Sequence, residues 1–187
     1  MVEQWRPIKQ KFDEMYERFI EHIEQRGVEI PDSGILAGPV CPVRPMIEAG
    51  QIRWRDMGWD NAHFPLDYRL LMQKGIPGII ACASEPHQDL TPTQQMYRAL
   101  IADCWIRIRE YVRQHGEAAL SRAAERPAEA DRLKRMAFNC LELTSHAPET
   151  FEQGLQLFWF IWRLRSNFTS CIGRMDVHLQ SLYERDV

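Results

Sequence analysis

The stretch PETFEQGLQLFWFIWRL, residues 148–164, decides the fold. Thr150 and Gln153 have the spacing of a capping box, which predicts a helix that begins at Phe151. Apolar side chains then point to almost every side of this helix instead of forming a single stripe. Helices of this kind are buried on several sides. We therefore expect either more chain or a partner subunit to cover residues 151–164.

Helical patterns also dominate the rest of the chain. Apolar residues spaced by three and four form one stripe from Trp5 to Ile23, and Gly27 has the character of a residue that ends a helix. A second capping box at Thr91–Gln94 introduces a helix that we expect to reach about Arg122. Further helices are predicted from Pro127 and over residues 175–185. The predicted fold class is mainly α.

Residues 28–64 interrupt this pattern with many prolines and glycines, and we expect them to be irregular. Pro65 can open the next helix at its first position, and Gly75-Ile76-Pro77-Gly78 is expected to interrupt that helix. The predicted organisation is one partial domain over 1–187. It consists of an N-terminal helix at 1–27, the irregular Gly/Pro/Trp segment at 28–64 and a helical part at 65–187.

Composition excludes several classes of function. The 187 residues carry a net charge of −3, which gives no electrostatic case for binding nucleic acid or an anionic membrane. Arginines alternate with acidic residues along the helices, so we expect them to pair within helices. No transmembrane stretch or signal peptide is visible, and we expect a cytoplasmic protein.

Cysteine and histidine spacing gives no sign of a disulfide framework or a metal site. The cysteines are odd in number and widely spaced, so we expect reduced thiols. They are Cys41, Cys82, Cys104, Cys140 and Cys171. Asp176 and His178 come nearest to a ligand pair, but on a helix they point to different faces. We predict no metal site, and an unrelated small metalloenzyme has no ligand cluster to support it.

His63 is the candidate substrate-binding residue. It lies in GWDNAHFPLDY, residues 58–68, where the irregular segment meets the start of a helix. A helix N-terminus favours anions and lowers the pKa of a nearby imidazole. A neutral His63 could hydrogen-bond a carboxylate, hydroxyl or carbonyl of a substrate. The alternative is a histidine that only caps the loop. No catalytic residue is assigned.

Three stretches of the chain resemble the glycyl radical enzymes, the group of pyruvate formate-lyase and the radical dehydratases and decarboxylases. The first is the Ala-His-Phe-Pro-Leu-Asp-Tyr core within 58–78, and the second is PETFEQGLQLFWF at 148–160, with Gly154 where the family usually has Ala. The third is IGRMDVHL at 172–179, followed by YERD at 183–186. Their order and spacing also fit the family.

This resemblance implies a ten-stranded α/β barrel, of which the chain would be the helical N-terminal part. The family cleaves C–C or C–X bonds anaerobically, as lyases or acyltransferases. It needs a thiyl Cys in a Gly-Cys loop and a glycyl radical in an Arg-Val-x-Gly-Tyr loop, installed by a radical-SAM activating enzyme. None of the 5 cysteines or 10 glycines of this chain matches these loops. We therefore expect no cofactor in this chain and no catalysis by the chain alone.

The resemblance also places His63 where family members reach the substrate, and a His there favours the dehydratase, decarboxylase and other C–X lyase branches over the acetyltransferase branch. Asp67 and Tyr68 are expected to cap and pack the helix that presents it. The implied partners are the remaining part of such an enzyme, a second copy of the chain and the activating enzyme. The alternative hypothesis is a stand-alone helical interaction protein that uses the apolar face at 151–164.

Overall fold

The computed structural model describes residues 6–38, 67–165 and 173–187, and every regular element within them is helical. This confirms the predicted mainly α class for the described part of the chain. The elements are α1 (Arg6–Arg26), α3 (Tyr68–Ser84), α4 (Pro92–Glu125), the short 3-10 helix η3 (Pro127–Glu129), α5 (Ala130–Glu142), α6 (Phe151–Arg165) and α7 (Met175–Asp186).

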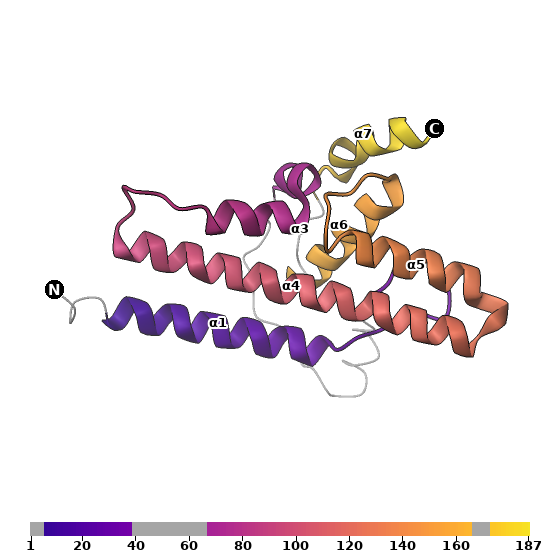
Figure 1. The fold of residues 1–187 in the computed structure, drawn as a ribbon, viewed down its shortest axis with the longest axis horizontal. Helices are drawn as coiled ribbons and strands as arrows, with labels where there is room; N and C mark the ends of the chain where they lie inside the picture. Colours follow the sequence, from indigo (N-terminus) through magenta and orange to yellow (C-terminus); the bar gives the residue numbers. More distant parts are fainter. Residues whose placement is uncertain (1–5, 39–66, 166–172) are drawn as a thin grey trace.

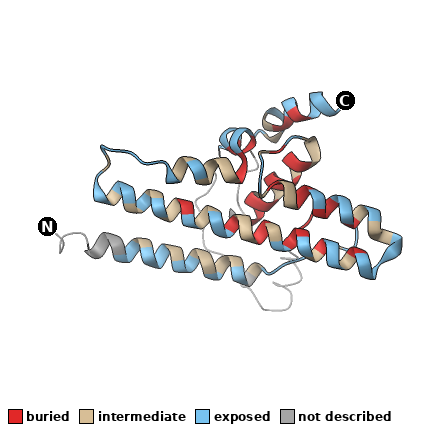
Figure 2. Cartoon of the chain, viewed as in Figure 1, coloured by how far each residue is buried: buried red, intermediate tan, exposed pale blue. Residues whose placement is uncertain are grey.

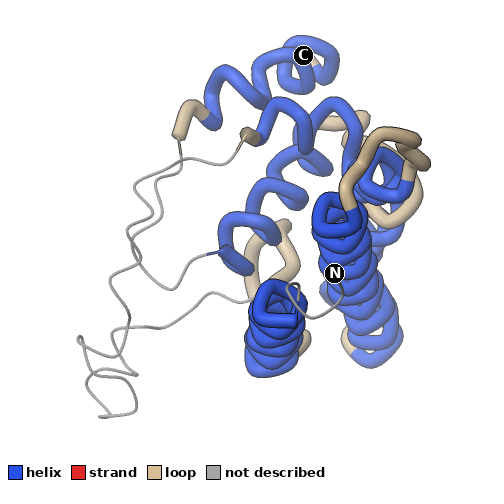
Figure 3. Tube along the Cα trace, turned by 90° about the vertical axis from the view of Figure 1, so that its left-hand side faces the viewer, coloured by secondary structure: helices blue, strands red, loops and turns tan. Residues whose placement is uncertain are grey.

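Helix α4 is the long central element of the molecule (Figure 1). At 34 residues it spans about 50 Å at the usual rise per residue. Helix α1 runs along one side of it, while α3 and α5 follow one another along another side. Helices α6 and α7 pack against each other, α6 also packs against α5, and α7 also packs against α3 (Figures 1 and 3).

The predicted helix starts are confirmed by their hydrogen bonds. At α4, the Gln94 amide donates to the Thr91 hydroxyl at 3.3 Å, and the Thr91 amide donates to the Gln94 side chain at 2.9 Å. At α6, the Gln153 amide donates to the Thr150 hydroxyl at 3.2 Å. Gly27 ends α1 with a φ of 61°, a left-handed conformation that glycine adopts at little cost.

Helix α3 differs from the expectation in its start but not in its interruption. It begins at Tyr68 with Asp67 as its cap, whereas Pro65 lies outside the described residues. Asp67 Oδ1 accepts from the Arg69 amide at 3.1 Å, as its predicted capping function requires. The predicted interruption at Gly75–Gly78 is confirmed: Gly75 has a non-helical backbone (φ 61°, ψ −176°), and α3 consists of two helical parts that meet at a kink there.

The loop that follows α1 is held by arginines of α4 and α5. Arg122 donates to the Ile30 carbonyl at 2.6 Å, and Arg132 donates to the Gly34 carbonyl at 3.0 Å. Asp32 pairs with both Arg122 and Arg126, and the hydrogen bond from Arg126 lowers the pKa of its carboxyl group. These contacts fix the described part of the irregular segment, residues 28–38, against the bundle.

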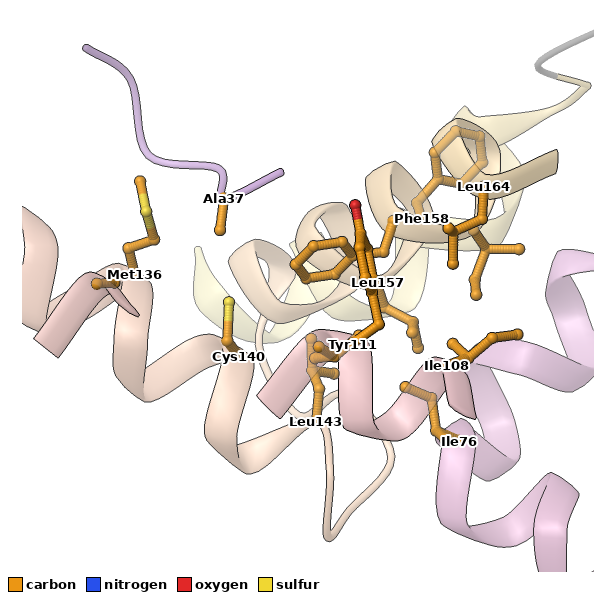
Figure 4. Close-up of a cluster of buried hydrophobic side chains, with 14 of the residues drawn as sticks. Ala37, Ile76, Ile108, Tyr111, Met136, Cys140, Leu143, Leu157, Phe158 and Leu164 are labelled. Atoms are coloured by element: carbon orange, nitrogen blue, oxygen red, sulfur yellow. The ribbon is translucent and has the colours of Figure 1, made fainter. Parts of the chain in front are cut away.

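The core lies where α4, α5 and α6 meet (Figure 2). Figure 4 shows that Ala37 of the loop joins this cluster, together with side chains from α3, α4, α5 and α6. The labelled members are Ile76, Ile108, Tyr111, Met136, Cys140, Leu143, Leu157, Phe158 and Leu164. A loop residue in the core means that the segment after α1 is part of the packing and not an appendage.

We expected more chain or a partner subunit to cover α6, but the described chain itself buries most of the apolar side chains of this helix. Phe158 and Phe160 are buried inside the chain itself, which covers more of this helix than the sequence suggested. Trp159 and Trp162 are only half-buried and lie against each other, with ring centroids 5.5 Å apart. The incompletely covered surface of α6 is therefore the Trp159/Trp162 face.

His115 is a buried histidine that bridges the loop and α4. Its Nδ1 donates to the Tyr111 carbonyl at 2.8 Å, and its Nε2 accepts from the Glu29 amide at 3.2 Å. The bond from the Glu29 amide requires the neutral imidazole, since a protonated ring has no acceptor for Glu29. Burial lowers the pKa of His115 to about 4, with the Tyr111 carbonyl acting in the opposite direction.

We expect the protein to lose stability as pH falls from 6.5 to 4. In this range an unfolded His115 binds a proton and the folded one does not, so acid favours the unfolded chain by roughly 3 kcal/mol. Urea unfolding at a series of pH values measures this slope. His115→Gln is expected to flatten it, while the exposed His87→Gln keeps it. An unchanged slope in His115→Gln would assign the acid sensitivity to other groups, such as His22, whose pKa burial also lowers.

Candidate functional site

Helix α6 holds the described residues on both sides of the segment that carries His63. On one side, Ala37 forms two hydrogen bonds with the fully buried Gln156. The Ala37 amide donates to Gln156 Oε1 at 2.7 Å, and Gln156 Nε2 donates to the Ala37 carbonyl at 2.9 Å. One side-chain amide thus satisfies both polar groups of a backbone residue that lies 119 positions away in the sequence.

Gly38 and Tyr68 complete this arrangement. Gly38 has a φ of 104°, and a Cβ atom there would lie 3.1 Å from the ring of Phe160. Tyr68 stacks on Phe158 with ring centroids 4.1 Å apart, which confirms that it packs the start of α3. Residues 38 and 68 therefore both contact α6. His63 lies outside the described residues, so its proposed contact with substrate stays a prediction.

The three resembling stretches meet around Gly154 of α6. A Cβ atom at this position would lie 2.5 Å from Leu182 Cδ1, 2.8 Å from Leu179 Cδ2 and 3.7 Å from the Met72 sulfur. Glycine thus lets α7 approach α6 closely, at the position where the resemblance gives Ala. The Phe151 amide also donates to Asp186 at 2.7 Å. Segments that are far apart in sequence are therefore packed into one unit.

A hollow of about 600 Å³ opens between the start of α3, the loop before α6 and α7. Its polar lining residues include Arg69, Gln73, Glu149, His178 and Arg185. Arg69 pairs with Asp67, and Arg185 Nε donates to the Ser181 carbonyl at 3.3 Å. These groups offer hydrogen bonds, but they form no pair of a nucleophile and a base.

The described cysteines are free thiols without the environment of a reactive thiol. They are Cys82, Cys104 and Cys140, whereas Cys41 and Cys171 lie outside the described residues. Burial raises the pKa of Cys140 to about 12 and also raises that of Cys104. A thiolate is the reactive form, so both groups are kept in the unreactive state.

Neither a metal cluster nor a membrane-spanning helix is present in the part of the chain that the structure describes. No three histidine, cysteine or acidic side chains there are grouped to hold an ion. None of the helices there is long and apolar enough to cross a bilayer. Asp176 pairs with Arg174 at 2.7 Å, an exposed ion pair next to His178 in sequence.

Two polar residues of α6 were not singled out from the sequence. Gln156 binds the Ala37 backbone, and Arg163 lies against two tryptophans. Both carry one common signal, which is a polar side chain inside a helix that is apolar nearly all round. A polar side chain in such a helix is expected to be buried and to need a hydrogen-bonding or aromatic contact, but the sequence does not identify the contacting residue. The arginine pairing along α4 was predicted, and Arg113 pairs with Glu110 and Glu117.

Comparisons with known proteins support the family resemblance of the sequence. Residues 46–187 match the pyruvate formate lyase-like family. A probable dehydratase of Escherichia coli, YbiW, is 31% identical over 140 residues, which are 68% of this chain and 17% of that protein. The (2S)-3-sulfopropanediol dehydratase of Klebsiella oxytoca is 30% identical over 138 residues, which are 67% of this chain and 17% of that protein.

The fold of the chain also resembles part of a solved dehydratase structure. The glycerol-bound form of the B12-independent glycerol dehydratase from Clostridium butyricum superposes with a TM-score of 0.56 at 23% identity. The match covers 66% of this chain and 17% of the dehydratase. The chain thus spans 17% of the length of the curated relatives named above.

The described helices, which bring three separated sequence stretches together around α6, resemble part of that solved dehydratase in their fold. The chain belongs to the pyruvate formate lyase-like family, that of the glycyl radical enzymes.

Proposed function

We propose that the chain is the N-terminal portion of a glycyl radical enzyme of the dehydratase type, and that it forms part of the helical layer around a ten-stranded barrel. The observation that carries this proposal is the meeting of the three family stretches around Gly154, on the helix that also contacts Gly38 and Tyr68. The named relatives are dehydratases, which favours C–O bond cleavage over acyl transfer. In this view residues 1–187 are one partial domain.

Within that enzyme, His63 would bind the substrate and the described residues would position it. Gln156 and Phe160 fix the chain before the segment, and Phe158 with the Asp67 cap fixes the chain after it. Precise placement of this kind is what a protein contributes when the reacting group is a radical.

No residue of this chain matches the loop that carries the glycyl radical in the family. Its glycines and cysteines lie in sequences unlike the two family loops, so we derive no step through a glycyl radical. We propose that catalysis requires those loops from elsewhere, together with a radical-SAM activating enzyme. An anaerobic cytoplasm is the compartment that this chemistry would need.

The isolated chain is expected to show no dehydratase activity. The assay uses glycerol, (2S)-3-sulfopropanediol and trans-4-hydroxy-L-proline, which are the substrates named by its relatives. Each is incubated anaerobically with the chain, an activating enzyme and S-adenosylmethionine, and products are measured by mass spectrometry. The full-length glycerol dehydratase serves as the positive control. Product formed by the chain alone would refute the view that it is a non-catalytic portion.

A second function, a stand-alone helical interaction protein, is favoured by one observation. Trp159 and Trp162 remain half-buried on α6. If this second function applies, the chain forms a monodisperse dimer or higher oligomer with a single sharp melting transition. Sedimentation velocity measures this directly. A broad melt with aggregation would instead favour the enzyme portion.

A further inference from the structure

The hollow between the start of α3, the loop before α6 and α7 has an apolar floor of buried residues. Met72, Pro148 and Leu182 come from these three elements, and all three line the hollow. A Cβ atom at Gly154 would lie 2.5 Å from Leu182 Cδ1 and 3.7 Å from the Met72 sulfur, so α3, α6 and α7 meet closely at this floor. The volume of about 600 Å³ is within the range of small-molecule sites.

The rim of the hollow carries one cation and one anion that do not pair with each other. Arg185 lines the hollow from α7, and its Nε donates to the Ser181 carbonyl at 3.3 Å, but it forms no ion pair with a described residue. Glu149 lines the hollow from the loop before α6. Its backbone amide donates to Gln153, whereas its carboxylate has no partner within the described part of the chain. The two charges therefore border the same space without neutralising each other.

The second guanidinium of the rim is already balanced. Arg69 pairs with Asp67 at 3.5 Å, so this pair adds no net charge to the hollow. His178 also lines the hollow, and its ring lies 6.0 Å from that of Tyr68, measured between centroids. Apart from this imidazole, the rim thus offers a ligand one unbalanced positive group and one unbalanced negative group.

An amino acid with an apolar side chain matches these features of the hollow. Its carboxylate has two oxygens, which a guanidinium binds through parallel N–H donors, as Arg185 can. Its ammonium group is a partner for the carboxylate of Glu149, and its side chain can cover the apolar floor. A simple anion would be repelled by Glu149, and a simple amine would be repelled by Arg185. A zwitterion meets neither repulsion.

We propose that this hollow binds one free amino acid with an apolar side chain, such as leucine. Its carboxylate binds Arg185, its ammonium group binds Glu149, and its side chain lies on Met72 and Leu182. This inference goes beyond the proposed function and does not rest on it, so it stands even if the chain has no link to radical catalysis.

An NMR titration of the ¹⁵N-labelled chain with L-leucine at pH 7 and constant ionic strength tests the site. Saturable shifts with a Kd of about 1 mM are expected at the backbone amides that border the hollow. Two truncated probes separate the charged groups of the ligand. 4-Methylpentanoate lacks the ammonium group and 3-methylbutylamine lacks the carboxylate, and each is expected to bind about fivefold to tenfold more weakly than leucine.

Two variants at exposed positions assign each charge to its partner. Arg185→Gln is expected to weaken leucine and 4-methylpentanoate but not 3-methylbutylamine. Glu149→Gln is expected to weaken leucine and 3-methylbutylamine but not 4-methylpentanoate. Arg174→Gln and Glu184→Gln change exposed charges of α7 outside the hollow, so both should bind leucine as the wild type does. The spectra themselves show that each variant is folded.

Three results would overturn the proposal. The first is the absence of saturable shifts with leucine up to about 20 mM, well above the expected Kd. The second is equal affinity for leucine and 4-methylpentanoate, because the ammonium group would then have no partner. The third is unchanged leucine binding in Arg185→Gln or in Glu149→Gln, which would place the amino acid elsewhere.

Discussion

Gly75→Ala is expected to lower the free energy of unfolding by about 3 to 5 kcal/mol, enough to unfold much of the protein. Gly75 has a φ of 61°, and a Cβ atom there would lie 2.6 Å from Ala147 Cα and 2.8 Å from the His146 carbonyl. Both obstacles belong to the backbone, so no rotamer change relieves them. The methyl group would push α3 away from the loop that leads into α6.

Gly27→Ala is the matched control for Gly75→Ala. Gly27 has the same φ of 61°, but a Cβ atom there would meet nothing within 4 Å. Gly27→Ala is expected to lower the free energy of unfolding by about 1 to 2 kcal/mol, the energy that alanine needs to adopt the left-handed conformation. Because Gly75 also has a ψ of −176°, a backbone region that is nearly restricted to glycine, the difference between the two variants in urea unfolding measures this extra strain together with the contact of α3 with residues 146 and 147. Equal losses in the two variants would show that this close contact does not exist.

Gln156→Leu is expected to cost about 3 kcal/mol, the second largest of these effects. The apolar side chain keeps the volume but leaves the buried Ala37 amide and carbonyl without partners. Gln156→Glu should also destabilise, because it keeps the acceptor for the amide and loses the donor to the carbonyl. Urea unfolding gives the cost, and hydrogen exchange at the Ala37 amide shows whether the loop has been released.

Gln180→Leu provides the comparison for Gln156. Gln180 is an exposed glutamine of α7 that bonds Glu184 at 2.7 Å, and its loss should change stability by less than about 0.5 kcal/mol. If Gln156→Leu is as mild as Gln180→Leu, α6 does not hold the loop that leads to the His63 segment. The proposed positioning of His63 would then lose its support.

Local sequence signals predicted most of the helices, because these signals act over three or four residues. The Thr91–Gln94 and Thr150–Gln153 capping boxes and the stop at Gly27 need no information from distant parts of the chain. The start of α3 was predicted less accurately. Both Pro65 and Asp67 are residues typical of a helix start, and in the structure Asp67 caps the helix. The glycines at 75 and 78 predicted an interruption of the helix, and the non-helical backbone at Gly75 confirms it.

Contacts between distant residues could not be predicted from these patterns. The pairing of Gln156 with Ala37 joins positions 119 residues apart, and no periodicity encodes it. The burial of Phe158 and Phe160 also depends on how the helices assemble. The hypothesis for His63 rests on sequence, and the described residues support it only indirectly, through Gly38 and Tyr68.

The most direct measurement of the central claim is electron paramagnetic resonance of the chain after anaerobic incubation with an activating enzyme and S-adenosylmethionine. A portion that contributes structure but no radical loop is predicted to give no protein-bound organic radical, while full-length glycerol dehydratase treated with its own activating enzyme gives one. A radical signal that is located on a glycine of this chain by isotope labelling would contradict the account.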